Sequence, residues 1–103
     1  MRNTEVFVHN FPAGTLKEEI KGREYIFVYH DDYSGEPVSL TMPVSRKKYH
    51  FKKFPPFFEG LLPEGLQLES LLRIAKIDRD DLFSQLISIG LDTVGAVTLR
   101  ETL

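Results

Sequence analysis

The sequence predicts an α+β domain, with a small antiparallel sheet or partly closed barrel of about five strands covered by two main helices. The first half alternates apolar and polar side chains with a period of two, which is typical of half-buried strands. The second half changes to the i, i+3, i+4, i+7 spacing of amphipathic helices. A last short apolar run follows these helices, and this segregated order of elements favours α+β.

Five short segments have the pattern of strands. They are residues 6–9, 15–17, 25–29, 38–42 and 96–99. The intervening Asn-Phe-Pro-Ala-Gly at 10–14 has the composition of a turn, in which Gly14 is expected to allow a positive φ. Residues 25–29 are apolar at every position, which predicts a strand covered on both faces. The final strand is expected to pair back onto the amino-terminal part of the sheet.

Two helices and one shorter helical turn are expected in the second half. Residues 57–62 leave room for about one turn before Pro63 ends it. From Glu64 a helix is predicted by the stripe Leu68, Leu71, Leu72 and Ala75. Asp78 is expected to be the N-cap of the next helix, and Gly90 is expected to end it. The apolar face of that helix consists of Leu82, Phe83, Leu86 and Ile89.

The composition is that of one globular domain, expected to span residues 1–103. Thirteen Lys and Arg against fifteen Asp and Glu give a net charge of −2, so bulk charge does not favour nucleic acid or anionic lipid. The absence of cysteine excludes disulfides, Cys-ligated metals and thiol nucleophiles. No apolar run reaches the roughly 18–20 residues of a membrane span, and the amino end has no signal-peptide core. We therefore expect a soluble, cytoplasmic protein without a membrane partner.

The sequence contains no recognisable catalytic motif, so we expect no enzyme activity, no catalytic residues, no metal and no cofactor. His30 beside Asp31 and Asp32 has the chemistry of a metal or acid–base site, although a polar loop leaving a strand is the favoured interpretation. Residues 90–95 have a glycine at each end. They follow a predicted helix and precede a predicted strand, whereas a phosphate-binding loop follows a strand and precedes a helix. We therefore expect a helix cap and a turn here.

A basic stretch at 46–53 interleaves cations with Tyr49 and Phe51. Its cations are Arg46, Lys47, Lys48, Lys52 and Lys53. Basic residues and rings of this kind hold single-stranded nucleic acid through phosphates and base stacking. The favoured interpretation is an edge strand or exposed loop whose lysines oppose edge pairing while the two rings face the core. The same cations could also dock onto an acidic protein surface.

Residues 54–66 combine prolines with Phe and Leu, and Leu66 is the unusual member. At 100° per residue, Leu66 lies about 160° from the centre of the apolar stripe near Leu68. It should therefore face solvent at the start of a helix that follows Pro63. A single exposed Leu needs no explanation, but one fixed on a rigid turn is also suited to anchor a partner.

Four segments of the chain, in this order, resemble the amino-terminal domain of HipA-type toxin kinases. They are S-L-T-M-P at 39–43, F-F-E-G-L-L-P-E-G at 57–65, D-L-F at 81–83 and I-G-L-D-T-V-G-A-V at 89–97. The corresponding family patterns are S-L-S-L-P, F-F-x-x-L-L-P-D/E, D-x-L and G-x-D-x-V-G-A. The opening residues 6–10, with 14–16, also resemble the family's first hairpin.

The resemblance implies a module without the kinase's ATP-binding and catalytic motifs, for which this chain has no positions. A chain of 103 residues beginning at Met1 resembles the small HipS-like component of tripartite HipBST-type toxin–antitoxin systems. That implies a non-catalytic antitoxin that binds and inhibits a separately encoded HipA-like (HipT-like) Ser/Thr kinase. A HipB-like helix-turn-helix protein would bind DNA in the same complex, and direct nucleic-acid binding by this chain is not expected.

The segment around Leu66 is expected to dock at or near the cleft of such a kinase. The expected contact residues are Phe57, Phe58, Glu59, Leu62, Pro63, Glu64, Gly65, Leu66 and Gln67. Three alternatives remain open. The chain could be the amino-terminal module of a longer HipA-type kinase, a nucleic-acid-binding module that uses residues 46–53, or a structural partner that stabilises a kinase without inhibiting it.

Overall fold

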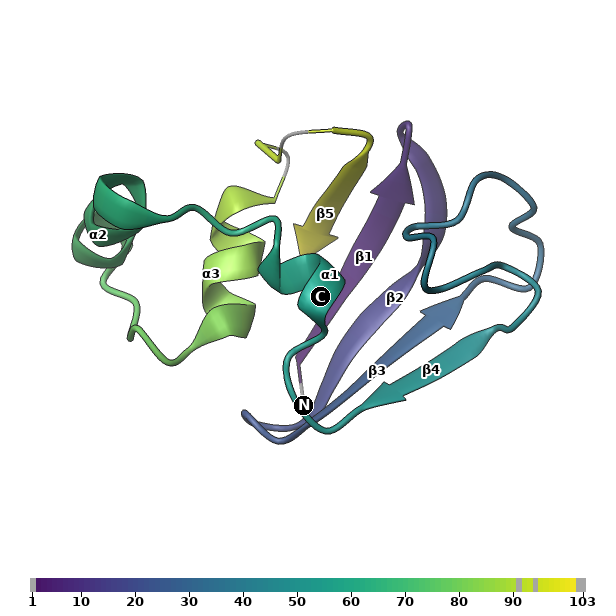
Figure 1. Cartoon of the computed structure of the whole chain (residues 1–103), viewed down its shortest axis with the longest axis horizontal. Coiled ribbons are helices and arrows are strands. Elements are labelled where there is room, and N and C mark those ends of the chain that lie inside the picture. The colour runs from purple at the N-terminus through teal and green to yellow at the C-terminus, as the bar shows by residue number, and fades with distance from the viewer. Residues whose placement is uncertain (1, 91, 94, 102–103) are drawn as a thin grey trace.

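Five antiparallel strands form one sheet in the order β4-β3-β2-β1-β5 in the computed structural model, which describes residues 2–90, 92–93 and 95–101 (Figure 1). The strands are β1 (Arg2–Val8), β2 (Phe11–Ile20), β3 (Glu24–Tyr29), β4 (Lys48–Phe51) and β5 (Val97–Glu101). The helices are α1 (Pro56–Glu59), α2 (Gly65–Ala75) and α3 (Leu82–Ile89). The predicted α+β class is confirmed, and the sheet is open, with β4 and β5 at its edges.

The first hairpin turns at His9 and Asn10, whose φ angles are 49° and 68°. Asn adopts this left-handed conformation more readily than most residues, which suits a tight hairpin turn. The expected role of Gly14 in the turn was wrong, because Gly14 is buried inside β2 beside Tyr29 of β3. A Cβ at this position would collide with the Val28 carbonyl oxygen. Because Gly14 has no side chain, β2 and β3 can approach each other closely at this position.

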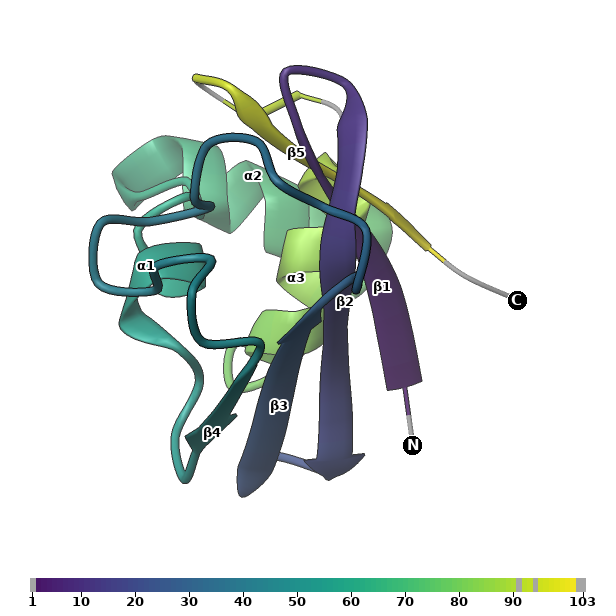
Figure 2. The same ribbon diagram turned by 90° about the vertical axis from the view of Figure 1, so that its right-hand side faces the viewer.

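The helices lie on one side of the sheet (Figure 2). In β3, Tyr25, Phe27 and Tyr29 are buried, while Ile26 and Val28 on the opposite face are only half-buried. The prediction of a strand covered on both faces was therefore wrong. A run without polar residues does not distinguish a doubly covered strand from one whose second face is partly open to solvent.

The expected fourth strand at 38–42 was also wrong. That segment makes a single bridge, Ser39 to Met42, and the fourth strand is β4 at the sheet edge. Tyr29 fixes the connection to β4, since its hydroxyl accepts from Val38 N at 2.9 Å and donates to the Met42 carbonyl oxygen. A buried side chain replaces the strand pairing that the apolar pattern suggested.

The core lies between the sheet and the helices α1 and α3. Phe27 of β3 packs edge-on to Tyr29 at 4.8 Å between ring centroids, and Phe58 of α1 lies 6.0 Å from Phe27. The helix α3 contributes Phe83 and Leu86, both fully buried. The expected closing strand is confirmed as β5, which pairs antiparallel with β1.

The start of α3 differs from the prediction. Asp81, not Asp78, is the N-cap, and its carboxylate accepts a hydrogen bond from Ser84 N at 3.2 Å. Asp78 instead accepts from Asp81 N through its carbonyl oxygen, in a turn before the helix. Gly90 ends α3 as expected. Leu91 and Val94, within the segment 90–95, lie outside the described residues.

Within the described part of the chain, no helix combines the length and the apolar composition needed to cross a membrane. The longest helix is α2, with 11 residues. A transmembrane helix needs about 20 residues.

Candidate functional site

Prolines define the segment that leads from the sheet to α2. Pro56 occupies the first turn of α1. Backbone N–H groups in the first turn have no acceptor within the helix, so the N–H that proline lacks costs no helical hydrogen bond there. The helix ends after one turn at Gly60, whose N–H bonds the Pro56 carbonyl oxygen at 3.0 Å. Pro63 separates this turn from α2, and Gly65 has a φ of 61° that suits glycine. The segment therefore has a well-defined backbone path.

Two of the expected contact residues differ in exposure although they are adjacent. Phe58 is fully buried in the core, so the expectation that it touches a partner is wrong. Phe57 is half-buried beside it, with the two rings edge-on at 5.3 Å between centroids. Phe58 holds α1 against the sheet, and only Phe57 is available at the surface.

Leu66 lies on the solvent side of α2, as its helical phase predicts, and its side chain is 86% exposed. Ile74, two turns later on the same outward side, is 78% exposed. No residue of α2 is buried, so this helix adds no fully buried side chain to the core. The stripe formed by Leu68, Leu71 and Leu72 is only half-buried, because α2 lies beyond α3 and away from the sheet (Figure 1).

A hollow of about 430 Å³ lies between the α1–α2 connection and the end of α3. Its lining is Gly60, Leu61, Leu62, Pro63, Glu64, Gln67, Ile89 and Asp92. The structure thus brings together four of the expected contact residues, Leu62, Pro63, Glu64 and Gln67. Glu59, Gly65 and Leu66 are exposed on the same connection. We call Phe57, Glu59 and residues 62–67 the docking surface.

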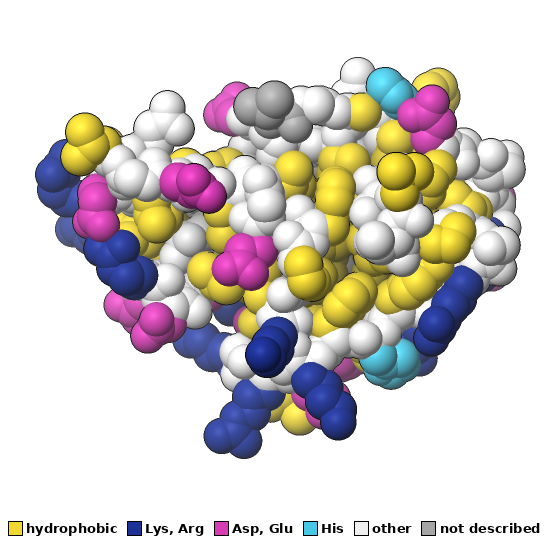
Figure 3. All heavy atoms as spheres, in the orientation of Figure 1, with side chains coloured by type: hydrophobic (Ala, Val, Ile, Leu, Met, Phe, Trp, Pro, Cys, Tyr) yellow, Lys and Arg dark blue, Asp and Glu magenta, His cyan; other side chains and the backbone are white. Residues whose placement is uncertain are grey.

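The face that carries α1 is rich in hydrophobic side chains (Figure 3). They gather over α1 and over the connection between β3 and β4. Leu40 in that connection is 94% exposed, and a hollow lined by Val38, Leu40 and Phe57 lies beside it. Exposed apolar patches on small domains mark interaction surfaces. The sequence placed Leu40 in the expected strand 38–42 and in the S-L-T-M-P motif, and neither pattern indicated that its side chain is exposed.

The basic stretch takes the structure of an edge strand. Tyr49 is buried and Phe51 half-buried against the core, as the favoured interpretation predicted. Arg46, Lys48, Lys52 and Lys53 are exposed, and Lys47 is partly buried with its Nζ 3.5 Å from the Tyr33 carbonyl oxygen. The strand separates these cations into two groups at its ends, about 13 Å apart.

Neither ring of this stretch is fully exposed to solvent. Tyr49 donates a hydrogen bond to the Pro43 carbonyl oxygen at 2.6 Å, and the Arg46 guanidinium lies 5.1 Å from its ring centroid. Base stacking needs an accessible ring face, and the surroundings of Tyr49 do not provide one. Phe51 packs against the core from the same strand.

His30 does not join the two aspartates that follow it. Its Nε2 contacts the Glu5 carboxylate of β1, while Asp31 and Asp32 are exposed. Among residues 2–90, 92–93 and 95–101, no group of three or more His, Cys, Asp or Glu side chains could hold a metal ion. This arrangement agrees with the polar-loop interpretation.

A polar cluster that sequence analysis missed connects β1, β2 and α3. Arg2 binds Glu18 at 2.7 Å and Asp81 at 2.8 Å, and Tyr25 donates to Glu18 at 3.2 Å. Burial and the neighbouring Glu18 carboxylate raise the pKa of Tyr25 to about 12. These residues are far apart in the chain, and no local motif could have predicted the cluster.

The comparisons with known proteins agree with this fold. A family model described as the HipA N-terminal domain matches residues 4–100. An uncharacterized protein of Haemophilus influenzae is 33% identical over 101 residues, covering 98% of this chain and 93% of that protein. A solved structure described as the N-terminal domain of HipA toxin superposes with a TM-score of 0.80 at 30% identity. That superposition covers 100% of this chain and 94% of the other. The chain therefore belongs to the HipA N-terminal domain family.

Proposed function

We propose that this protein is a non-catalytic antitoxin that binds and inhibits a separately encoded HipA-like Ser/Thr kinase in the cytoplasm. The observation that carries the proposal is Leu66, an 86% exposed apolar side chain on a helix with no buried residue. Family membership supports the choice of partner, because a domain that packs on a kinase within one chain needs a docking face when it acts in trans.

The docking surface has the features of a binding anchor. In sequence, Leu66 lies between Glu64 and Gln67, which line the hollow together with apolar Leu62 and Pro63. Interfaces commonly combine a few apolar anchors with a polar rim, and most of the binding energy comes from the anchors. The proposed inhibition is steric or allosteric: Leu66 enters or borders the kinase cleft and prevents productive binding of nucleotide or substrate.

The nucleic-acid interpretation has weaker support, whereas a structural role fits the same surface. Nucleic-acid binding by residues 46–53 would need accessible rings, but Tyr49 is buried and the cations are divided between the ends of β4. In the proposed complex a HipB-like helix-turn-helix protein binds the DNA. A purely structural role would use the same docking surface, so it must be separated from inhibition by experiment.

The proposal is tested by purifying the kinase that binds this chain from its native host and titrating the chain against it. Antitoxin function predicts a saturable loss of phosphoryl transfer as the chain is added. Binding without loss of activity would identify a structural subunit. Recovery of nucleic acid without a kinase would contradict the proposal and favour the basic stretch.

A further inference from the structure

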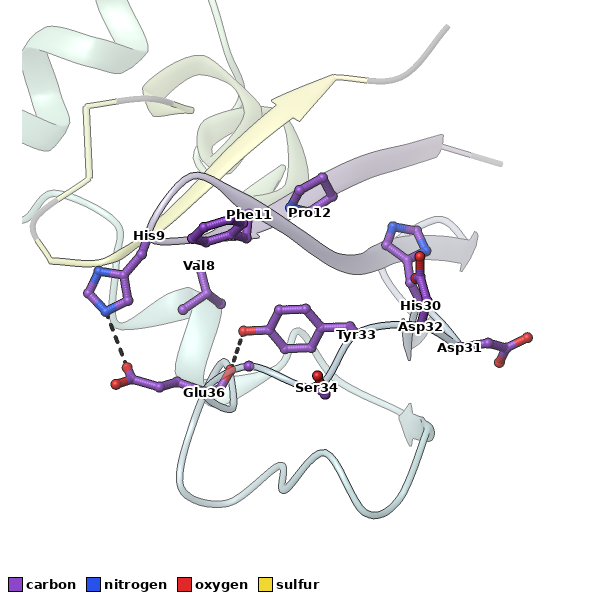
Figure 4. Close-up of a pocket in the computed structure, with 11 residues that line it drawn as sticks. Val8, His9, Phe11, Pro12, His30, Asp31, Asp32, Tyr33, Ser34 and Glu36 are labelled. Carbon is purple, nitrogen blue, oxygen red and sulfur yellow. Dashed lines mark hydrogen bonds and ion pairs between the residues drawn. The ribbon is translucent and has the colours of Figure 1, made fainter.

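A further cavity, separate from the docking surface, lies between the β1–β2 turn and residues 30–36 (Figure 4). Its volume is about 850 Å³, within the range of about 300–1,000 Å³ that is typical of ligand sites. The lining residues are Val8, His9, Phe11, Pro12, His30, Asp31, Asp32, Tyr33, Ser34, Gly35 and Glu36. It shares no residue with the docking surface, and the proposed function does not use it.

The middle of this pocket is lined by apolar side chains, and the Tyr33 ring there is fixed by its contacts. Val8 and Phe11 face Tyr33 across the cavity (Figure 4). The Tyr33 hydroxyl donates to the Glu36 carbonyl oxygen, and its ring stacks parallel to Tyr29 at 5.9 Å between centroids. Phe11 is 67% exposed at the rim. A binding partner that covers Phe11 would remove a large aromatic surface from water, which favours association.

The two ends of the pocket are acidic. Asp31 and Asp32 lie at one end, and Glu36 lies at the other, where it pairs with His9 at 3.2 Å (Figure 4). No Lys or Arg belongs to the described lining. Lys47 reaches the Tyr33 carbonyl oxygen from outside the lining. The two histidines of the lining, His9 and His30, pair with Glu36 and with Glu5 of β1, so Asp31 and Asp32 are the carboxylates left for a ligand's cations. The electrostatic complement of this pocket is therefore basic.

We infer that this pocket binds an extended segment of a partner protein in which an apolar residue is flanked by Lys or Arg. The apolar side chain would lie between Phe11 and Tyr33, and the basic groups would pair with Asp31 and Asp32. A segment of chain fits better than a small organic amine, because Phe11 at the rim is covered only by a ligand that extends beyond the cavity. The carboxylates of the pocket require a positively charged partner segment, and the rings of Phe11 and Tyr33 require an apolar side chain at its centre.

The test is selection from a random heptapeptide library displayed on phage, with the whole chain immobilised. The selected peptides are then compared on four variants by fluorescence anisotropy. Phe11→Ser should weaken binding at least about tenfold. Asp31→Asn with Asp32→Asn should weaken it about two- to fivefold and reduce its salt dependence. Ile20→Ser and Glu24→Gln, exposed substitutions on β2 and β3 outside the pocket, are the matched controls and should bind like the parent.

Nuclear magnetic resonance of the labelled chain locates the site. The inference predicts that the selected peptides carry an apolar residue flanked by Lys or Arg. It also predicts that the peptides shift amides in the β1–β2 turn and in residues 30–36. Selection of acidic peptides, or equal binding by the parent and Phe11→Ser, would overturn it. Saturation by 2-phenylethylamine as tight as by the peptides would overturn the choice of a protein segment.

Discussion

Arg2 joins the first strand of the sheet to the start of α3 through a salt bridge of 2.8 Å with Asp81. The same guanidinium binds Glu18 of β2 at 2.7 Å and the Ser84 hydroxyl at 2.7 Å, and it lies 5.0 Å from the Phe83 ring centroid. One side chain thus satisfies carboxylates from two distant parts of the chain. This arrangement fixes α3 on the sheet and supports the elements that position the α1–α2 connection.

Replacing Arg2 with Ala is expected to destabilise the fold by about 2 kcal/mol, because it leaves the buried Glu18 carboxylate without its cation. Urea unfolding followed by circular dichroism measures the change. Arg79→Ala is the matched control, since it breaks an exposed pair with Glu69 and should cost less than about 1 kcal/mol. Equal effects of the two substitutions would refute a special role for Arg2.

The stability of the protein should fall as the pH drops from about 4 to about 2. Burial alone would raise the pKa of Asp81, but hydrogen bonds from Arg2 and Ser84 outweigh it and lower the pKa to about 2. A depressed carboxyl pKa contributes stability above the unfolded-state value, and this contribution is lost as the pH falls through the folded-state value. In the unfolded chain Asp81 returns to an ordinary value near 3.8.

Asp81→Asn should therefore cost up to about 2 kcal/mol at neutral pH and little near pH 2. Urea unfolding of both proteins across this pH range measures the difference. A difference between parent and variant that stays constant down to pH 2 would show that Asp81 does not titrate in this way.

Gly14→Ala is expected to destabilise the fold by more than about 2 kcal/mol, since the added Cβ collides with the Val28 carbonyl and the Phe27 ring. Gly60→Ala is the comparison. Its Cβ would meet the Phe57 carbonyl oxygen at 3.3 Å and the Pro56 carbonyl oxygen at 3.6 Å, and φ at Gly60 is −64°. Its effect should stay below about 1 kcal/mol. Thermal unfolding of the two variants ranks them, and the reverse order would disprove the close approach of β2 and β3.

Removing the charge of the β4 edge should promote self-association. Lys48→Val combined with His50→Val replaces two exposed polar side chains on an edge strand with β-branched apolar ones. Light scattering after size-exclusion chromatography should detect dimers or larger species. Lys17→Val, on the inner strand β2, tests whether added apolar surface alone is responsible, and it should keep the oligomeric state of the parent protein.

The elements that the sequence predicted well have strong local signals. The helices α2 and α3 follow from leucine spacing, β5 follows from an apolar run, and the solvent position of Leu66 follows from helical phase alone. The motifs shared with the HipA N-terminal domain family also gave the correct family.

Features that depend on distant contacts could not be predicted from local pattern. The segment 38–42 resembles a strand, yet Tyr29 holds it as a loop through two hydrogen bonds. The sequence does not distinguish Phe57 from Phe58, because they are adjacent residues of the same type. Phe58 is the buried one because it packs against Phe27. The partial burial of α2 depends on its placement beyond α3, which no periodicity reveals.

We propose that this domain inhibits a HipA-like kinase through Leu66. The most direct measurement is the inhibition constant of the parent chain, of Leu66→Glu and of Ile20→Glu against that kinase. Ile20→Glu is the matched control, because it places the same charge on another exposed apolar site, at the end of β2. We expect inhibition to be at least about tenfold weaker for Leu66→Glu and unchanged for Ile20→Glu. Full inhibition by a folded Leu66→Glu variant would contradict it.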